Sequence, residues 1–134
     1  MPANGKRIMV VDDDPDFVMT TEAALKAAGY EVSQCLDATG ALDAIRKVAP
    51  DLLILDVMME RGAAGFQIAQ QLRRESAFAR LPILMVTAIH QTTKLRFSPD
   101  TDGDFLPVDE FLDKPVEPEK LVERVGVLLA AAGR

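Results

Sequence analysis

The sequence of 134 residues has few of the residues that build covalent or metal-bound cores. Cys35 is its single cysteine, which excludes an internal disulfide framework and a cysteine-rich zinc site. The longest apolar run, residues 125–132 with Gly126 inside it, is too short to span a bilayer. Residues 1–7 lack the apolar core of a signal peptide, so we expect a cytoplasmic protein.

Basic residues are also in deficit. There are 15 Lys and Arg against 21 Asp and Glu, which gives a net charge of −6. This balance argues against a protein held to nucleic acid by counterion release, and an anionic membrane would repel it. We therefore expect protein partners, with neither nucleic acid nor membrane among them.

The residues that are present describe an ordinary globular domain. Hydrophobic residues make up 49% of the chain and charged residues 27%, close to the average for folded proteins. The length suits one domain of common size. We expect a single domain over residues 6–131, with no output domain attached.

The apolar pattern predicts an α/β fold. Five short runs indicate strands: Ile8–Val11, Val32–Leu36, Leu52–Met58, Ile83–Val86 and Glu110–Leu112. Three of them are continuous rather than alternating, which is typical of strands covered on both faces. Apolar residues at helical spacing lie between the runs, in residues 17–28, 38–48, 66–72 and 121–129. The order favours a doubly wound, five-stranded parallel sheet with helices on both faces.

The fourth crossover differs from the others. Residues 98–107 hold two prolines, one glycine and three aspartates, a composition that resists helix formation. We expect a short or disrupted fourth helix that begins near Gln91 and stops before Pro99. The acidic loop Asp100–Asp109 then has two open interpretations, a functional segment or a tolerated surface insertion.

Reactive side chains follow the strand ends, which meet at one edge of a parallel sheet. Asp12–Asp14 follow the first strand, Asp56 the third, Thr87 the fourth and Lys114 the fifth. Two carboxylates about 4 Å apart repel by roughly 4 kcal/mol at an effective dielectric of 20, so this cluster should raise pKa values or recruit a cation. Oxygen ligands favour Mg²⁺ or Mn²⁺. A carboxylate beside such an ion, an ammonium and a hydroxyl is equipped to accept a phosphoryl group.

Four motifs carry a resemblance to a known family. They are Val10-Val11-Asp12-Asp13-Asp14, Leu53-Ile54-Leu55-Asp56-Val57-Met58-Met59, Met85-Val86-Thr87-Ala88 and Phe111-Leu112-Asp113-Lys114-Pro115. Together they resemble the receiver domain of two-component response regulators, over essentially the whole chain. The resemblance implies a flavodoxin-like (CheY-like) fold and a phosphorylation-dependent switch rather than an enzyme, with only self-phosphorylation and self-dephosphorylation chemistry of its own.

The resemblance also implies a donor and a metal site. Asp56 is similar to the phosphoacceptor, which takes a phosphoryl group from the phosphohistidine of a sensor histidine kinase or a phosphotransfer protein. Asp13 resembles the direct Mg²⁺ ligand, and Asp12 the residue that holds the metal through water. The resemblance implies the backbone carbonyl of Met58 as a third protein ligand. Relatives usually have proline at the position that Glu60 occupies here, so we expect the loop that contains Met58 to have a different shape.

The remaining family roles concern the switch. Thr87 resembles the hydroxyl that binds the phosphoryl group in the active state, and Lys114 the lysine that pairs with it. Phe111 resembles the aromatic residue whose rotamer reports the state, and the resemblance implies a cis peptide bond between Lys114 and Pro115. Signalling would then proceed by contact with an unknown downstream protein.

Two apolar residues are expected to modulate the lifetime of the phosphoryl group. Met58 and Ile89 lie two residues beyond Asp56 and Thr87 and flank the site. If both side chains shield the phosphoryl group from water, self-dephosphorylation should be slow, and Met58→Asn or Ile89→Glu should not lengthen its half-life.

Three alternatives stay open at this point. Asp12-x-Asp14 after an apolar strand, with Thr87 and Lys114 later, resembles a haloacid-dehalogenase-like phosphohydrolase with Asp12 as nucleophile. A degenerate receiver-like module could bind partners unphosphorylated. The spacing of acidic residues from Ser98 to Asp109 weakly resembles a calcium-binding loop, and Pro107 weakens that interpretation.

Overall fold

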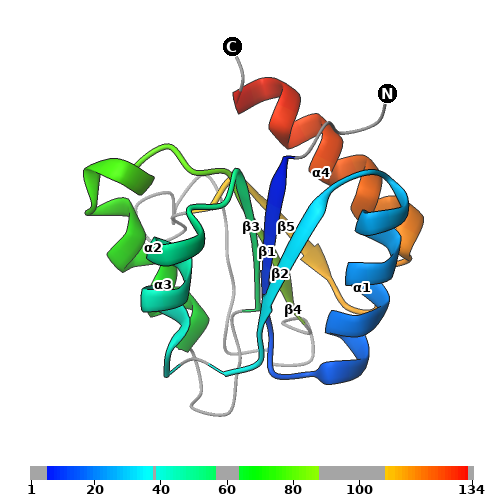
Figure 1. The fold of residues 1–134 in the computed structure, drawn as a ribbon, viewed down its shortest axis with the longest axis horizontal. Helices are drawn as coiled ribbons and strands as arrows, with labels where there is room; N and C mark the ends of the chain where they lie inside the picture. Colours follow the sequence, from blue (N-terminus) through cyan, green and yellow to red (C-terminus); the bar gives the residue numbers. More distant parts are fainter. Residues whose placement is uncertain (1–5, 38, 57–63, 88–107, 133–134) are drawn as a thin grey trace.

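The computed structural model describes residues 6–37, 39–56, 64–87 and 108–132. Along the chain the elements are β1 (Arg7–Val11), α1 (Pro15–Ala27), β2 (Glu31–Cys35), α2 (Ala41–Val48), β3 (Leu52–Leu55), α3 (Ala64–Arg73), a 3₁₀ turn η1 (Ser76–Phe78), β4 (Ile83–Thr87), β5 (Glu110–Asp113) and α4 (Pro118–Ala132). All five strands pair in parallel in the order β2-β1-β3-β4-β5 (Figure 1). This order reverses at β1, so the crevice beyond the carboxyl ends of β1 and β3 is the expected place for a site.

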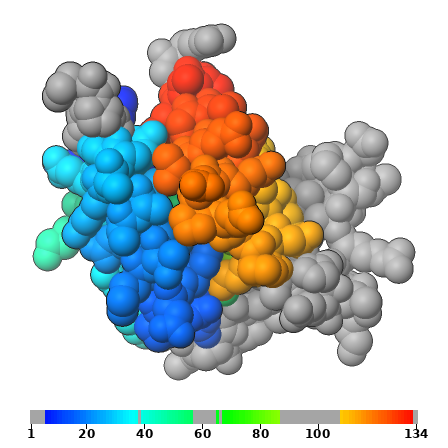
Figure 2. Space-filling view, turned by 90° about the vertical axis from the view of Figure 1, so that its right-hand side faces the viewer, coloured from blue at the N-terminus to red at the C-terminus, as the bar shows by residue number. Residues whose placement is uncertain are grey.

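Two helical layers cover the sheet. Figure 1 shows α2 and α3 on one face and α1 and α4 on the other. Successive side chains of a strand point to opposite faces, and the continuous apolar strands use both faces. The α2/α3 cluster contains Met9, Val11, Leu53, Leu55, Ile83 and Met85 from the strands, and the α1/α4 cluster contains Ile8, Val10, Leu52, Ile54, Leu84 and Val86. Figure 2 shows α1 and α4 lying against each other over the second face.

Local signals in the sequence set the helix ends. Asp14 caps the first turn of α1 with its side chain, and α4 begins at Pro118, whose fixed φ suits a first turn. Gly29 has φ 99° just after α1, a conformation that glycine adopts without strain. α2 begins at Ala41 rather than at residue 38, and it ends before Pro50.

The predicted α/β fold with a five-stranded parallel sheet is confirmed, with small differences at the strand ends. β3 stops at Leu55, although the backbone N–H of Asp56 still donates to the carbonyl oxygen of Val11 at 3.0 Å. The predicted short fourth helix and most of the acidic loop fall in residues 88–107, outside the described residues. None of the helices in the described ranges has the length and apolar content that crossing a bilayer requires.

Candidate functional site

Two buried carboxylates stand where the two central strands end. In the sheet Val11 of β1 pairs with Leu55 of β3, so Asp12 and Asp56, the next residues, come side by side. The backbone N–H groups of both are still held by the sheet, that of Asp12 by the carbonyl oxygen of Cys35 at 3.1 Å. Asp12 is 1% exposed and Asp56 5%. Carboxylates are rarely buried to this degree unless a cation compensates them.

A third carboxylate completes an acidic pocket. One carboxylate oxygen from each of Asp12, Asp13 and Asp56 lies within 4.8 Å of the other two. Three hard oxygen donors from two strand ends fit a small divalent cation such as Mg²⁺ or Mn²⁺, which keeps waters in its remaining positions. Asp13 is half-buried, so the pocket is open to such waters on its side.

Lys114 supplies positive charge from a different strand. It directly follows β5, and its Nζ lies 2.8 Å from Asp12 Oδ2 and 3.7 Å from Asp56 Oδ2. Its side chain is only 18% exposed, so water screens these ion pairs weakly. The bond between Lys114 and Pro115 is cis, as the family resemblance implied. The ammonium thus reaches both buried carboxylates at once.

The environment of Asp12 remains incompletely satisfied. Burial raises the pKa of Asp12, and the nearby Lys114 ammonium and the Asp14 N–H offset this only in part. Its Oδ1 accepts the N–H of Asp14 at 2.9 Å. Within the described part of the chain no group donates an aligned hydrogen bond to Oδ2, although Lys114 pairs with it. A buried oxygen with spare acceptor capacity fits a site for a cation or its water.

The acidic triplet divides into two tasks. Asp14 Oδ1 accepts the N–H of Asp16 at 3.1 Å and that of Phe17 at 3.3 Å, so this residue is the cap of α1. Asp12 and Asp13 instead face the pocket with Asp56. Of these three acids, only Asp14 therefore serves as the helix cap.

Other predicted site residues are placed in part. Thr87 ends β4 opposite Asp113 of β5, which puts its main chain at the same sheet edge. Phe111 is half-buried and packs against the α2/α3 cluster. Met58 and Ile89 lie outside the described residues.

Sequence reasoning missed one member of the site. Lys114 Nζ lies over the ring of Phe17, 4.5 Å from its centroid, although the sequence placed Phe17 simply on the apolar face of a helix. The helical spacing could not reveal this, because the contact joins the first turn of α1 to the far end of the chain.

Asp109, the last acidic residue of the calcium-loop spacing, already has other partners in the structure. Asp109 Oδ2 accepts the N–H of Ile83 at 2.8 Å and lies 2.9 Å from Arg73 Nη2. A carboxylate oxygen held by a backbone donor and a guanidinium is occupied in clamping β5 to the start of β4. The rest of that loop lies outside the described residues.

Comparison with known proteins settles the family. Residues 8–126 match the model of the response regulator receiver domain. The chain belongs to the response regulator receiver domain family. Neither the phosphohydrolase alternative nor the unphosphorylated module is favoured by this match.

Curated relatives of this receiver domain include DNA-binding regulators. It is 34% identical over 128 residues to the DNA-binding dual master transcriptional regulator RpaA of Synechocystis. This alignment covers 96% of the chain and 51% of RpaA. It is 33% identical over 120 residues to the DNA-binding response regulator MtrA of Mycolicibacterium smegmatis, covering 90% of the chain and 49% of MtrA. The chain thus spans about half the length of the curated relatives it matches.

Solved structures agree with this fold. A response regulator from Chloroflexus aurantiacus superposes with a TM-score of 0.79 at 34% identity, covering 95% of this chain and 99% of that one. The chemotaxis response regulator CheY4 of Vibrio cholerae gives a TM-score of 0.78 at 28% identity, covering 93% and 99%.

Proposed function

We propose that this receiver domain, over residues 6–131, accepts a phosphoryl group on Asp56 from a phosphohistidine of a histidine kinase or phosphotransfer protein. The observation that carries the proposal is the convergence of three carboxylates with one ammonium: the oxygens of Asp12, Asp13 and Asp56 lie within 4.8 Å of one another, and Lys114 Nζ reaches two of them. Membership of the receiver family supports it. The cytoplasm is the compartment that we propose, from the composition of the chain.

In the transfer step an Oδ atom of Asp56 attacks phosphorus in line with the donor nitrogen. The new oxygen–phosphorus bond forms as the nitrogen–phosphorus bond breaks, and the donor imidazole retains that electron pair. Lys114, already beside Asp56, is placed to pair with the phosphoryl oxygens. We assign to Thr87 a hydrogen bond to one of these oxygens, and to Phe111 the rotation that accompanies it.

The acidic pocket is the proposed metal site. Asp12, Asp13 and Asp56, together with the Met58 carbonyl, would hold Mg²⁺ or Mn²⁺, whose positive charge offsets the negative charges of the carboxylates and the incoming phosphoryl group. Asp12 Oδ2 supports this assignment, because it is buried and receives no aligned hydrogen bond from the described residues besides its ion pair with Lys114. Without a cation, the approach of a dianionic phosphoryl group to three carboxylates would be strongly repelled.

The product is a switch rather than a turnover catalyst in this proposal. The acyl phosphate on Asp56 would stabilise the state in which Thr87 and Lys114 bind it, and Met58 and Ile89 would shield it from water. A shift from a minor to a major population needs only a few kcal/mol of differential contacts. A downstream protein would read the shifted state by direct contact.

A phosphorylation assay with a small phosphodonor tests the proposal. Incubation with acetyl phosphate and Mg²⁺ should add one phosphoryl group by intact mass, and EDTA or Asp56→Asn should abolish it. Asp51→Asn is the matched control, since Asp51 precedes the same strand at its other end and binds the N–H of Arg7 there. Phosphorylation that survives Asp56→Asn and disappears in Asp12→Asn would favour the phosphohydrolase chemistry instead.

A further inference from the structure

Phe17 occupies a place in the site that the receiver chemistry above does not use. Its ring lies under the Lys114 ammonium, with Nζ 4.5 Å from the ring centroid. We infer that Phe17 is a positioning residue that holds the ammonium at the acidic pocket before phosphoryl oxygens arrive. This inference rests on the proposed function, and it adds to that function a residue on α1.

The contact has the geometry and the environment of an effective cation–π interaction. A cation within about 6 Å of a ring centroid is attracted by the negative face of the ring, and the attraction grows as water is excluded. The Lys114 side chain is 18% exposed, so its ammonium is largely desolvated. Phe17 itself is half-buried and belongs to the residues that pack against the α1/α4 cluster.

The Phe17 ring is held in place by the first turn of α1, whereas the long Lys114 side chain is flexible by itself. Asp14 caps α1 and accepts the N–H of Phe17, which fixes the first helical turn at the pocket edge. Phe17 and Lys114 both line a hollow between this turn and the segment after β5, and Figure 2 shows the two segments next to each other. A lysine side chain has four rotatable bonds, and ordering them costs conformational entropy. If the anchored ring already orders Lys114 in the folded protein, that cost does not fall on phosphoryl binding.

A cation–π contact with Phe17 allows the Lys114 ammonium to exchange carboxylate partners for phosphoryl oxygens. Lys114 Nζ now lies closer to Asp12 than to Asp56, at 2.8 Å against 3.7 Å. A ring face attracts the ammonium without using a particular N–H direction, unlike a carboxylate. The ammonium can therefore turn its donors toward new oxygens on Asp56 while it stays over the ring.

A purely structural role for Phe17 predicts different behaviour. If the ring only fills space beside the core, an apolar side chain of similar size should serve as well. Phe17→Leu keeps most of the apolar contact and removes the ring face, whereas Phe17→Tyr keeps both. Leu128→Ala is a control for stability alone, because Leu128 is half-buried against the same cluster from α4.

The test measures beryllofluoride binding to the full chain at fixed Mg²⁺, together with side-chain NMR of Lys114 without either ligand. We expect Phe17→Leu to weaken beryllofluoride binding about 3- to 10-fold, Phe17→Tyr to stay within about twofold of wild type, and Leu128→Ala to lower the thermal midpoint without changing affinity. The upfield ring-current shift of the Lys114 methylene protons should vanish in Phe17→Leu and persist in Phe17→Tyr. Phe17→Met carries the same expectation if the leucine variant does not fold.

Two results would overturn the inference. One is wild-type affinity in Phe17→Leu, which would show that the ring only fills space. The other is an equal loss in the leucine and tyrosine variants, which would show that the ring face is not what holds the ammonium. Failure of the wild-type chain to bind beryllofluoride would instead refute the proposed function on which the inference rests. The two failures are therefore distinguishable.

Discussion

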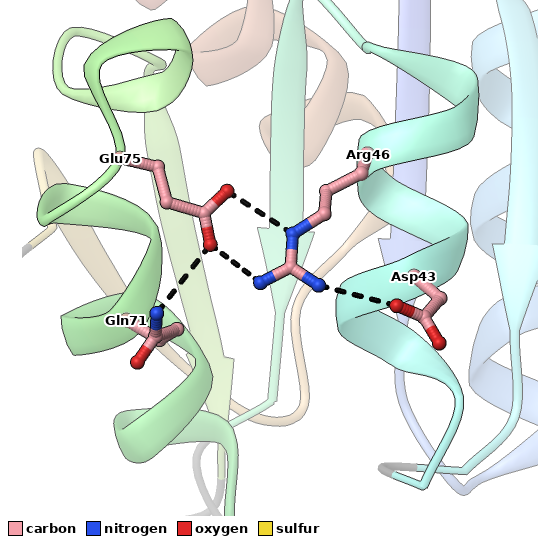
Figure 3. Close-up of polar contacts among 4 residues, drawn as sticks. All are labelled: Asp43, Arg46, Gln71 and Glu75. Carbon is pink, nitrogen blue, oxygen red and sulfur yellow. Dashed lines mark hydrogen bonds and ion pairs between the residues drawn. The ribbon is translucent and has the colours of Figure 1, made fainter.

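Arg46 of α2 and Glu75, just beyond α3, form a two-point ion pair. Arg46 Nε lies 3.1 Å from Glu75 Oε1, and Arg46 Nη2 lies 2.6 Å from Glu75 Oε2 (Figure 3). Asp43 accepts from Arg46 Nη1 at 3.1 Å, and Gln71 Nε2 lies 3.5 Å from Glu75 Oε2. This network, Asp43–Arg46–Glu75–Gln71, ties together the two helices that cover one face of the sheet.

The Arg46–Glu75 pair should make stability depend on pH in a definite direction. The hydrogen bond from Arg46 holds the pKa of Glu75 below its ordinary value of 4.5. The folded state therefore favours the carboxylate, so the pair's contribution is complete above pH 4.5 and is lost as pH falls through the lower, folded pKa. A double-mutant cycle with Arg46→Met and Glu75→Gln should give a small favourable coupling at pH 7 that vanishes in strong acid.

Added salt provides a second check on that pair. Exposed ion pairs are screened by ions, so the coupling in the cycle should shrink as sodium chloride rises. Gln71→Ala is the matched control, since it removes a neighbour of Glu75 without removing a charge. A coupling that is unchanged between pH 7 and strong acid would contradict the assignment.

The parts of the site that local pattern determines could be predicted from the sequence. A continuous apolar run that ends in an acidic residue fixes both the strand and the edge at which that residue emerges, as at Asp12 and Asp56. Parallel pairing then brings such ends together whatever their separation in the chain. The acidic pocket was predictable for this reason.

Contacts that depend on side-chain rotamers could not be predicted from the sequence. The cap at Asp14 and the pocket residue Asp13 are adjacent acids, and only the turn into α1 separates their tasks. The Phe17–Lys114 contact joins two segments whose approach depends on how α1 and the end of β5 pack. No periodicity encodes either arrangement.

Arg73 should be a stabilising clamp at the opposite end of the sheet. Its Nη1 donates to the carbonyl oxygens of Phe78, Ala79 and Leu81, and its Nη2 pairs with Asp109 at 2.9 Å. A lysine cannot reproduce this fork, so we expect Arg73→Lys to lower the free energy of unfolding by about 1–2 kcal/mol in urea denaturation. Arg74→Lys, on an exposed neighbour, should change it by less than about 0.5 kcal/mol. Equal effects of the two variants would argue against the clamp.

Magnesium should stabilise the folded chain if the acidic pocket holds it. A ligand that binds only the folded state adds about 1.4 kcal/mol at ten times its dissociation constant. The thermal midpoint should therefore rise with Mg²⁺ in wild type and not in Asp13→Asn. Asp37→Asn controls for general charge loss, because Asp37 is exposed after β2. A magnesium response that persists in Asp13→Asn would remove Asp13 from the site.

Asp12→Asn should separate stability from metal binding. The carboxylate is 1% exposed, and both burial and the neighbouring Asp13 carboxylate oppose its charge, which Lys114 offsets only in part. An isosteric amide relieves this cost, and Lys114 keeps Asp56 as an ion-pair partner. In EDTA at neutral pH we expect the variant to be more stable than wild type by on the order of 1 kcal/mol. Its magnesium affinity should fall, because the amide lacks the negative charge that attracts the ion. Urea denaturation with and without Mg²⁺ measures both effects, and a variant less stable than wild type in EDTA would show that the pair with Lys114 outweighs the burial cost.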